Sequence, residues 1–491
     1  MDEKRIPRYE SLASRMIELI ESGAYKRGER LPSIRDLADS FHVSVTTARE
    51  AYAFLEKKRY VEAVPQSGYY VCDNATVSSP VAPDPASMDP EQFGLCRIYS
   101  VLHDGGSVDE DACGLAIATL SPDMMPIERL QKYAVDAVRL HANDSFHYQM
   151  APGYGPLREQ IAIHGLSSGT RLLPDRVIVT SGCQEAVYLA LAAVTSPGDT
   201  VAIESPIYFS VLGLLESLHL KVLEIPCSPE EGMHLETLAF ALERYDVAAV
   251  FTIANFHNPT GSLMPDVKKA ALVDMLADRG IPLIEDDIYG DLYYGSACPR
   301  GMERPRTCKS FDTDGTVLYC SSVSKTLSPG LRIGWLEPGR WYARAERLKN
   351  LINLGASAIP QVAVALFLQD GALSRHLRKV RVTLGGKMAA MRESVLAHFP
   401  EGTRVSDPSG GMVLWVALPD GTASRELYSR ALEKKIMIAP GHVFSFQKRF
   451  DSHLRLNAGV WESGTDEKIR ALGCIAKELC PAGRSVSIAE A

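Results

Sequence analysis

The sequence lacks several features that define common protein classes. Its ten cysteines include no C-x-x-C pair, and ten in 491 residues are too few for a disulfide-rich scaffold. No apolar run reaches the roughly 18 residues that cross a bilayer. The N-terminal stretch MDEKRIPRYE also lacks the apolar core of a secretory signal. We therefore expect reduced thiols, a cytoplasmic location and no membrane contact.

Positive charge is scarce as well. The formal net charge is −8, which argues against a protein that coats nucleic acid along its whole surface. Residues 1–73 hold 12 basic and 12 acidic side chains and are neutral, so the remaining residues carry the whole negative excess. Any contact with DNA must therefore come from a local cluster in the N-terminal part. With 46% hydrophobic and 23% charged residues, the chain has the composition of a folded protein with several domains.

The first part of the chain has the pattern of a winged helix-turn-helix. Apolar residues recur at helical spacing within 8–22. Ser33 and Ser44 then stand where N-caps of two further helices are expected. Strand-like residues flank a turn within 61–71, which indicates a β-hairpin. This order predicts a DNA-binding domain over residues 1–73; the alternative is a small helical cap on a larger enzyme.

The rest of the chain divides into a linker, an α/β domain and a tail. Residues 74–111 are rich in Pro, Ser, Ala and Asp and predict a linker. From 112 to 480 strand-like and helical stretches alternate, which favours an α/β domain with a mostly parallel sheet and, from about residue 361, a smaller α+β lobe. Residues 481–491 form a C-terminal tail. The strand-like runs are Val177–Thr180, Val201–Glu204, Val222–Ile225, Ala249–Ile253, Leu283–Asp286 and Thr316–Cys320.

Two motifs in the α/β domain suggest a bound phosphate and a reactive lysine. Ser181, Gly182 and Cys183 join a strand to a helix, and a helix N-terminus after a glycine turn favours phosphate. Lys325 follows another strand between small hydroxyl residues, where a desolvated lysine can form a Schiff base. Ser322 and Arg332, in the same motif, are candidates to hold an anion beside it.

Other polar residues stand at or inside apolar strands. Asp286 ends a strand, where a carboxylate can keep a pyridine nitrogen protonated, and Tyr289 can donate to a phenolate. Asn258 is a neutral donor after a third strand, although an Asn-Pro pair is also a common turn. Arg455 lies inside an apolar strand, and a buried arginine favours a carboxylate partner.

With these motifs, residues 112–480 resemble the aspartate aminotransferase superfamily of fold type I, which uses pyridoxal 5′-phosphate. The resemblance rests on SVSKTLSPGLRIGW around Lys325, on Asp286 with Tyr289, on Asn258-Pro and on Arg455-Leu-Asn, in the family's order. It implies a large α/β domain with a small C-terminal lobe.

The family resemblance implies a role for each residue. Lys325 would form the internal aldimine, Asp286 would pair with the pyridine nitrogen and Tyr208 would stack on the ring, so these three are the catalytic candidates. Arg455 and Asn258 would bind an amino acid substrate. Tyr148 would reach the phosphate of the other subunit, which implies a homodimer. No metal is implied. The remaining cofactor contacts would come from Ser181, Gly182, Cys183, Asn258, Tyr289, Ser322 and Arg332.

Residues 9–71 resemble the GntR-family winged helix, through GERLPSIRDLA, VSVTTAREAY and GYYV. By this resemblance the DNA contacts come from Arg35, Ser44, Thr46, Thr47, Arg49 and the wing at Gly68. A GntR head joined to an aminotransferase-like domain is the architecture of MocR-subfamily regulators. We therefore predict a regulator that binds operator DNA and senses an amino acid or amine by aldimine exchange at Lys325. The alternatives are an active transaminase with an accessory DNA-binding head, and a sensor of the cofactor alone.

Overall fold

The computed structural model describes residues 29–41, 43–57, 61–64, 68–71, 114–294 and 303–480, except 420 and 448, and single residues between 9 and 25. The chain forms two compact units, Met1–Phe93 and Gly94–Ala491. The predicted tail, the whole predicted linker and most of the predicted helix over 8–22 lie outside the described residues. Among the described residues, no helix is long and apolar enough to cross a membrane.

The smaller unit has the predicted winged-helix elements. Ser33 caps the first described helix: its side chain accepts from the backbone N–H of Asp36, whose carboxylate accepts from Ser33 in return. Ser44 caps the next helix by accepting from the N–H of Thr47 at 3.1 Å. The elements are α2 (Ile34–Ser40), α3 (Val45–Lys57) and the antiparallel hairpin of β1 (Val61–Val64) and β2 (Gly68–Val71).

Aromatic packing joins the hairpin to the helices. Tyr52 of α3 stacks on Tyr69 of β2, with ring centroids 4.2 Å apart and an angle of 5° between the planes. The Tyr52 hydroxyl donates to the carbonyl of Pro32 at 2.5 Å, and burial raises the pKa of this phenol. Leu37 and Leu55 are fully buried in the same cluster. The wing is thus fixed to the helix that precedes it.

The larger unit is built on an eight-stranded sheet in the order β3-β10-β9-β8-β7-β4-β5-β6. The pairs β9–β8, β8–β7, β7–β4 and β4–β5 are parallel, whereas β10 and β6 pair antiparallel, so the predicted mostly parallel sheet is confirmed. The strands are β3 (Ile178–Thr180), β4 (Thr200–Ser205), β5 (Lys221–Ser228), β6 (Gly232–Met233), β7 (Val247–Thr252), β8 (Leu283–Asp286), β9 (Val317–Ser322) and β10 (Gly334–Glu337).

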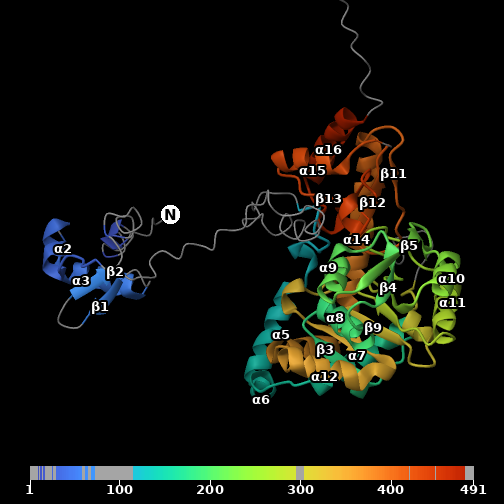
Figure 1. Cartoon of the computed structure of the whole chain (residues 1–491), viewed down its shortest axis with the longest axis horizontal. Helices are drawn as coiled ribbons and strands as arrows, with labels where there is room; N and C mark the ends of the chain where they lie inside the picture. Colours follow the sequence, from blue (N-terminus) through green and yellow to red (C-terminus); the bar gives the residue numbers. More distant parts are fainter. Residues whose placement is uncertain are drawn as a thin grey trace, which may run out of the picture. The chain divides into compact units, whose positions relative to one another are not determined.

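Helices flank this sheet (Figure 1). The central β strands are buried along nearly their whole length because helices cover them, as in other α/β folds. The helices are α5 (Ile127–Leu140), α6 (Ala142–Phe146), α7 (Gly155–Gly165), α8 (Cys183–Val194), α9 (Phe209–Ser217), α10 (Leu235–Arg244), α11 (Asp266–Ala277), α12 (Tyr342–Asn353) and α13 (Ala358–Gln369).

The C-terminal part forms the small α+β lobe. Its four-stranded antiparallel sheet has the order β11-β12-β14-β13, and helices α14 to α16 pack in the same region (Figure 1). Strand β12 pairs with β14, which carries Arg455 opposite Trp415. The elements are α14 (Ala372–His398), β11 (Arg404–Val405), β12 (Val413–Ala417), α15 (Ser424–Glu433), β13 (Ala439–Pro440), β14 (His453–Asn457) and α16 (Thr465–Leu479).

Candidate functional site

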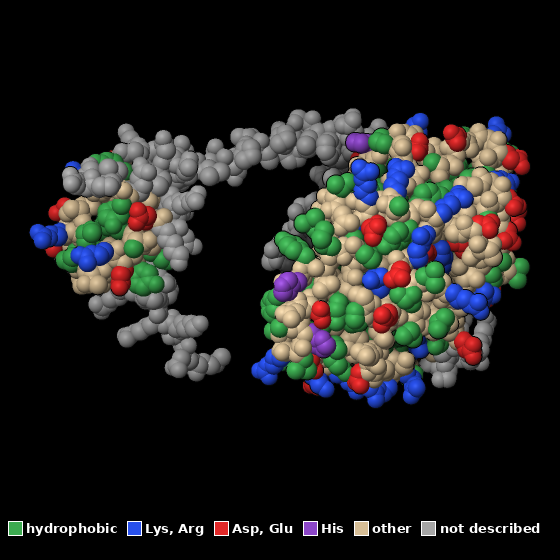
Figure 2. Space-filling model, turned by 90° about the horizontal axis from the view of Figure 1, so that it is seen from below, with side chains coloured by type: hydrophobic (Ala, Val, Ile, Leu, Met, Phe, Trp, Pro, Cys, Tyr) green, Lys and Arg blue, Asp and Glu red, His purple; other side chains and the backbone are tan. Residues whose placement is uncertain are grey.

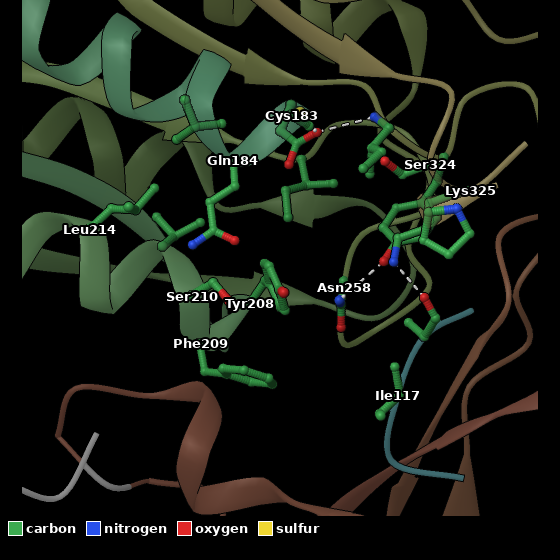
Figure 3. Close-up of a pocket in the computed structure, with 18 of the residues that line it drawn as sticks. Ile117, Cys183, Gln184, Tyr208, Phe209, Ser210, Leu214, Asn258, Ser324 and Lys325 are labelled. Carbon is green, nitrogen blue, oxygen red and sulfur yellow. Dashed lines mark hydrogen bonds between the residues drawn. The ribbon is translucent and has the colours of Figure 1, made fainter. Parts of the chain in front are cut away.

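A cavity of about 280 Å³ lies near the carboxyl ends of the parallel strands and reaches Arg455 of the small lobe. Ligands of open α/β sheets bind at this edge. Figure 3 shows Gln184, Tyr208, Asn258 and Lys325 arranged around it. Of the residues predicted from the sequence, the cavity brings together Cys183, Tyr208, Asn258, Asp286, Tyr289, Lys325, Arg332 and Arg455.

Lys325 lies in the turn after β9, half-buried, with its amine at the cavity. Its Nζ donates to the carbonyl of Ala118 at 2.5 Å. Burial lowers the pKa of Lys325 to about 8, and the charge of Arg455 adds to this, while Asp286 opposes it. A lysine with this pKa is partly neutral near pH 7, so its nitrogen is available as a nucleophile.

Asp286 ends β8 in the same cavity. Its Oδ1 accepts from the Sγ of Cys183 and from the N–H of Ile288, both at 3.1 Å. Burial raises the pKa of Asp286 to about 6. The charged form is therefore costly here unless a cation or a protonated nitrogen lies beside it, which is what a protonated pyridine ring would provide.

Asn258 connects the cofactor side of the cavity to Arg455. Its Nδ2 donates to the Tyr289 hydroxyl at 3.3 Å, and its Oδ1 accepts from Nη1 of Arg455 at 3.1 Å. Arg455 is 1% exposed and also donates from Nη2 to the carbonyl of Ala116, while its Nε has no hydrogen-bond partner in the described part of the chain. Among the described residues, no carboxylate pairs with this guanidinium. A buried, incompletely satisfied arginine favours an anionic ligand.

A close contact at the start of α8 forms a cradle for an anion. Gly182 has φ +92°, and a Cβ on it would lie 2.3 Å from Nη2 of Arg332. That guanidinium donates to the carbonyl of Ser181 at 2.8 Å. The first N–H groups of α8 and the guanidinium thus lie together, and both attract phosphate.

The structure does not bring every predicted residue to the cavity. Ser322 accepts from the N–H of Ser324 at 3.2 Å, and Ser324, two residues on, lines the cavity instead. Ser181 takes part through its backbone carbonyl, which accepts from Arg332. Tyr148 is 84% exposed and does not line this cavity.

Sequence reasoning also missed residues that line the cavity. Ala116, Ile117 and Ala118 form one side, and Gln184 follows Cys183 at the start of α8. Gln184 directly follows the predicted phosphate motif, so the sequence could have identified it as a cavity residue. The first three have small or apolar side chains, and no chemical signal in the sequence marked them.

The predicted DNA-contacting residues lie on one small unit. Arg35 of α2 and Thr46 and Arg49 of α3 are exposed. Ser44 and Thr47 share a hydrogen bond of 2.9 Å between their hydroxyls at the start of α3.

The wing glycine, Gly68, has φ +119° and lies beside the guanidinium of Arg30, a residue the sequence did not single out. Figure 2 shows basic side chains on this unit interspersed with acidic and hydrophobic ones.

Comparisons with known proteins agree with this geometry. Residues 120–472 match the family model of aminotransferases of class I and II, and residues 8–71 match that of bacterial regulatory proteins of the gntR family. The uncharacterized HTH-type transcriptional regulators YjiR and YdcR of Escherichia coli K12 are each 34% identical to this chain. The matches cover 95% and 96% of this chain and 98% and 99% of theirs.

A solved structure supports the cofactor assignment. The α-aminoadipate aminotransferase LysN of Thermus thermophilus, complexed with N-(5′-phosphopyridoxyl)-L-leucine, is 29% identical. The match covers 76% of this chain and 94% of that one, with a TM-score of 0.70. An amine, a carboxylate at a strand end and a phosphate cradle around one cavity fit pyridoxal phosphate. The chain therefore belongs to the MocR-type transcriptional regulators, in which a GntR DNA-binding domain is fused to a pyridoxal phosphate-dependent aminotransferase-like domain.

Proposed function

We propose that this regulator senses an amino acid or amine in the cavity of its larger unit and changes its affinity for operator DNA in response. The observation that carries the proposal is that Lys325 and Arg455 line one cavity. The first is an amine with a lowered pKa, and the second is a buried guanidinium with an unused Nε. An α-amino acid carries the two groups that these residues complement, an amine and a carboxylate.

Each residue has a proposed task. Pyridoxal phosphate, when bound, supplies an aldehyde that condenses with primary amines. Lys325 presents its neutral amine to that aldehyde, and Asp286 holds a proton on the pyridine nitrogen. Tyr208, just before α9, stacks on the ring. Asn258 and Tyr289 donate to the phenolic oxygen.

The phosphate and the effector have their own proposed contacts. The N-terminus of α8 and Arg332 hold the phosphate. Ser322 was also predicted to contact the phosphate, and the only support for this is that Ser322 lies next to Ser324 at the cavity. Arg455, with Asn258, binds the effector carboxylate, because a guanidinium holds a carboxylate by two parallel hydrogen bonds.

The DNA-binding head is proposed to span residues 1–73, followed by a linker over 74–111 and the aminotransferase-like part over 112–480. Exposed Arg35, Thr46 and Arg49 are available for DNA contacts. Ser44 caps α3 by accepting from the N–H of Thr47, and the two hydroxyls lie at the start of this helix. A protein that binds operator DNA works where the DNA is, so we propose a cytoplasmic location.

We also propose a homodimer. Tyr148 is 84% exposed between two other exposed apolar side chains, Phe146 and Met150. This stretch lies beside the end of α12, because the N–H of Ala151 donates to the carbonyl of Leu354, itself exposed, at 3.2 Å. Contiguous exposed apolar side chains are typical of an interaction surface. The proposed role of Tyr148, contact with the phosphate in the second subunit, requires this surface to be covered.

A titration tests the proposed function. The full-length protein, loaded with pyridoxal phosphate, is mixed with individual amino acids and amines while the visible absorbance and the operator affinity are measured together. An effector should change both. Loss of the absorbance band of the aldehyde form with release of a 2-oxo acid, and no effect on operator affinity, would favour the transaminase alternative. An operator affinity that follows pyridoxal phosphate but no amine would favour the cofactor sensor.

A further inference from the structure

Along residues 115–119, consecutive backbone carbonyls alternate between two sets of hydrogen-bond donors. The carbonyls of Leu115, Ile117 and Thr119 all accept from Asn457: from its backbone N–H at 3.0 Å, and from its Nδ2 at 2.7 and 2.8 Å. The two carbonyls between them accept from two side chains that line the cavity. Ala118 accepts from Lys325, and Ala116 accepts from Arg455. Figure 3 shows Ile117 at the cavity.

The two groups of contacts differ in what a ligand does to them. Asn457 is fully buried and is not part of the cavity lining, so its three hydrogen bonds are independent of a ligand. Its Oδ1 is also engaged, by the N–H of Gly459 at 2.9 Å. Asn457 therefore fixes the segment to the end of β14 whether or not the cavity is filled.

The contacts of Ala116 and Ala118 compete with ligands. A carboxylate is a stronger acceptor for Arg455 than the neutral Ala116 carbonyl, because hydrogen bonds between charged partners are about twice as strong. Condensation of Lys325 with the cofactor aldehyde forms a carbon–nitrogen double bond and releases water, which removes N–H groups that Lys325 can donate to Ala118. The cofactor thus weakens the Ala118 contact and a carboxylate-bearing ligand weakens the Ala116 contact, while the three contacts of Asn457 remain.

We infer that the 115–119 segment is the element that reports the state of the cavity to the DNA-binding head. The inference rests on the proposed function and names its regulation. In the sequence, this segment follows the linker proposed over 74–111, so a change in its freedom acts at the covalent connection to the DNA-binding head. Asn457 acts as a positioning residue that keeps the segment in register, while Ala116 and Ala118 are the contacts that ligands replace.

Hydrogen–deuterium exchange of the full-length protein tests the local part. Pyridoxal phosphate alone should raise the exchange of peptides covering 114–121, because the Lys325 contact is lost. N-(5′-phosphopyridoxyl)-L-leucine should also raise it, through Arg455, by about tenfold for the loss of one hydrogen bond to a charged group. The matched adduct of 3-methylbutylamine lacks only the carboxylate and should have a much smaller effect. Equal exchange with both bound adducts would overturn the inference.

A variant tests the connection to DNA. Asn457→Asp keeps the shape and the acceptor for Gly459 but removes both Nδ2 donors. The ratio of operator affinities with and without the leucine adduct should approach one, while cofactor absorbance is kept. Ser121→Ala is the control, because it removes the side-chain hydrogen bonds of Ser121 with Lys387 and Asp123, just beyond the segment. A variant that keeps the full response would contradict the inference; if it does not fold, the exchange experiment on the wild-type protein still decides.

The two hypotheses fail in different ways. If operator affinity responds to the adduct while exchange of 114–121 is unchanged, the inference is wrong and the proposed function stands. If exchange rises as expected but no ligand changes operator affinity, the proposed regulatory function is wrong, and with it the transmission to DNA.

Discussion

Arg455 donates from Nη1 to Oδ1 of Asn258 at 3.1 Å, although the two residues are 197 positions apart and belong to different lobes. Asn258 follows β7 of the large sheet, whereas Arg455 lies in β14 of the small lobe. Since Asn258 also donates to Tyr289, the residue proposed for the carboxylate and those proposed for the cofactor ring form one hydrogen-bonded chain. A ligand that binds Arg455 can therefore affect the cofactor position through Asn258 alone.

Replacing Arg455 should separate sensing from cofactor binding. Hydrogen bonds to charged groups contribute about 1.5–3 kcal/mol each, so losing two should weaken an amino acid ligand by on the order of 10²-fold or more. Arg455→Ala should keep its visible cofactor band, while its operator affinity should no longer change when the amino acid is added. An amine without a carboxylate should bind nearly as before, which serves as the control. A response to the amino acid at wild-type concentrations would show that Arg455 is not the carboxylate anchor.

Cofactor attachment should depend on pH through Lys325. Its pKa is lowered from 10.5 to about 8, and only the neutral amine reacts. The attachment rate, followed by stopped-flow absorbance, should rise about tenfold per pH unit below 8 and then level off. Borohydride should fix the cofactor to the wild type but not to Lys325→Ala. A rate that still rises up to about pH 10 would indicate an ordinary lysine.

The same shift makes the cofactor-free protein more stable at alkaline pH. Between pH 8 and 10.5 the folded state binds fewer protons at Lys325 than the unfolded state does. The free energy of unfolding should therefore rise with pH in this window, relative to that of Lys325→Met. Urea unfolding curves at several pH values measure the difference.

Asp286→Asn should stabilise the cofactor-free protein at neutral pH while weakening cofactor binding. Burial raises the pKa of Asp286 from 3.8 to about 6, so between these values the folded state binds more protons and stability falls as pH rises. Above pH 6 the variant avoids a cost of at most about 3 kcal/mol. The gain should be present at about pH 7 and absent at about pH 4. Urea unfolding should show no such gain for Asp246→Asn, an exposed carboxylate.

A pair of glycine variants should isolate the phosphate cradle. Gly182 and Gly198 have φ +92° and +93°, so an alanine at either position carries the same backbone strain. Only at Gly182 would the new Cβ meet Arg332; nothing lies within 4 Å at Gly198. Gly182→Ala should weaken pyridoxal phosphate binding at least about tenfold, since a charged hydrogen-bonding group is displaced. Equal affinities of the two variants, by absorbance titration, would speak against the cradle.

DNA binding should depend on Arg35 and Arg49. Each is exposed on the helix pair, and loss of a phosphate contact should lower the salt slope of operator affinity by about one unit. Arg35→Ala and Arg49→Ala should therefore weaken binding, measured at several salt concentrations on a footprinted operator. Arg139→Ala, an exposed arginine of α5, is the control. Unchanged affinity in both head variants would refute the assigned surface.

Local chemistry explains why much of the protein could be predicted from its sequence. The capping pair of Ser33 and Asp36 lies within one helical turn, so its signal is complete in four residues. The runs that became β7, β8 and β9 begin with apolar residues and are buried along nearly their whole length, because both faces of the sheet are covered. Lys325 and Asp286 follow such strands directly, and the carboxyl ends of parallel strands share one edge. Their meeting in one cavity was therefore predictable.

Only the tertiary structure determined the strand neighbours and backbone contacts that no side-chain pattern in the sequence indicates. Strand β10 inserts between β9, the strand before it in the sequence, and β3, which comes from a distant part of the chain. Ser324 lines the cavity and Ser322 does not, because of the way the chain turns after β9. Above all, the carbonyls of Ala116 and Ala118 reach Arg455 and Lys325 through backbone atoms. Every residue carries the same carbonyl, so sequence pattern cannot mark which ones will meet a buried cation; only the packing of the folded chain selects them.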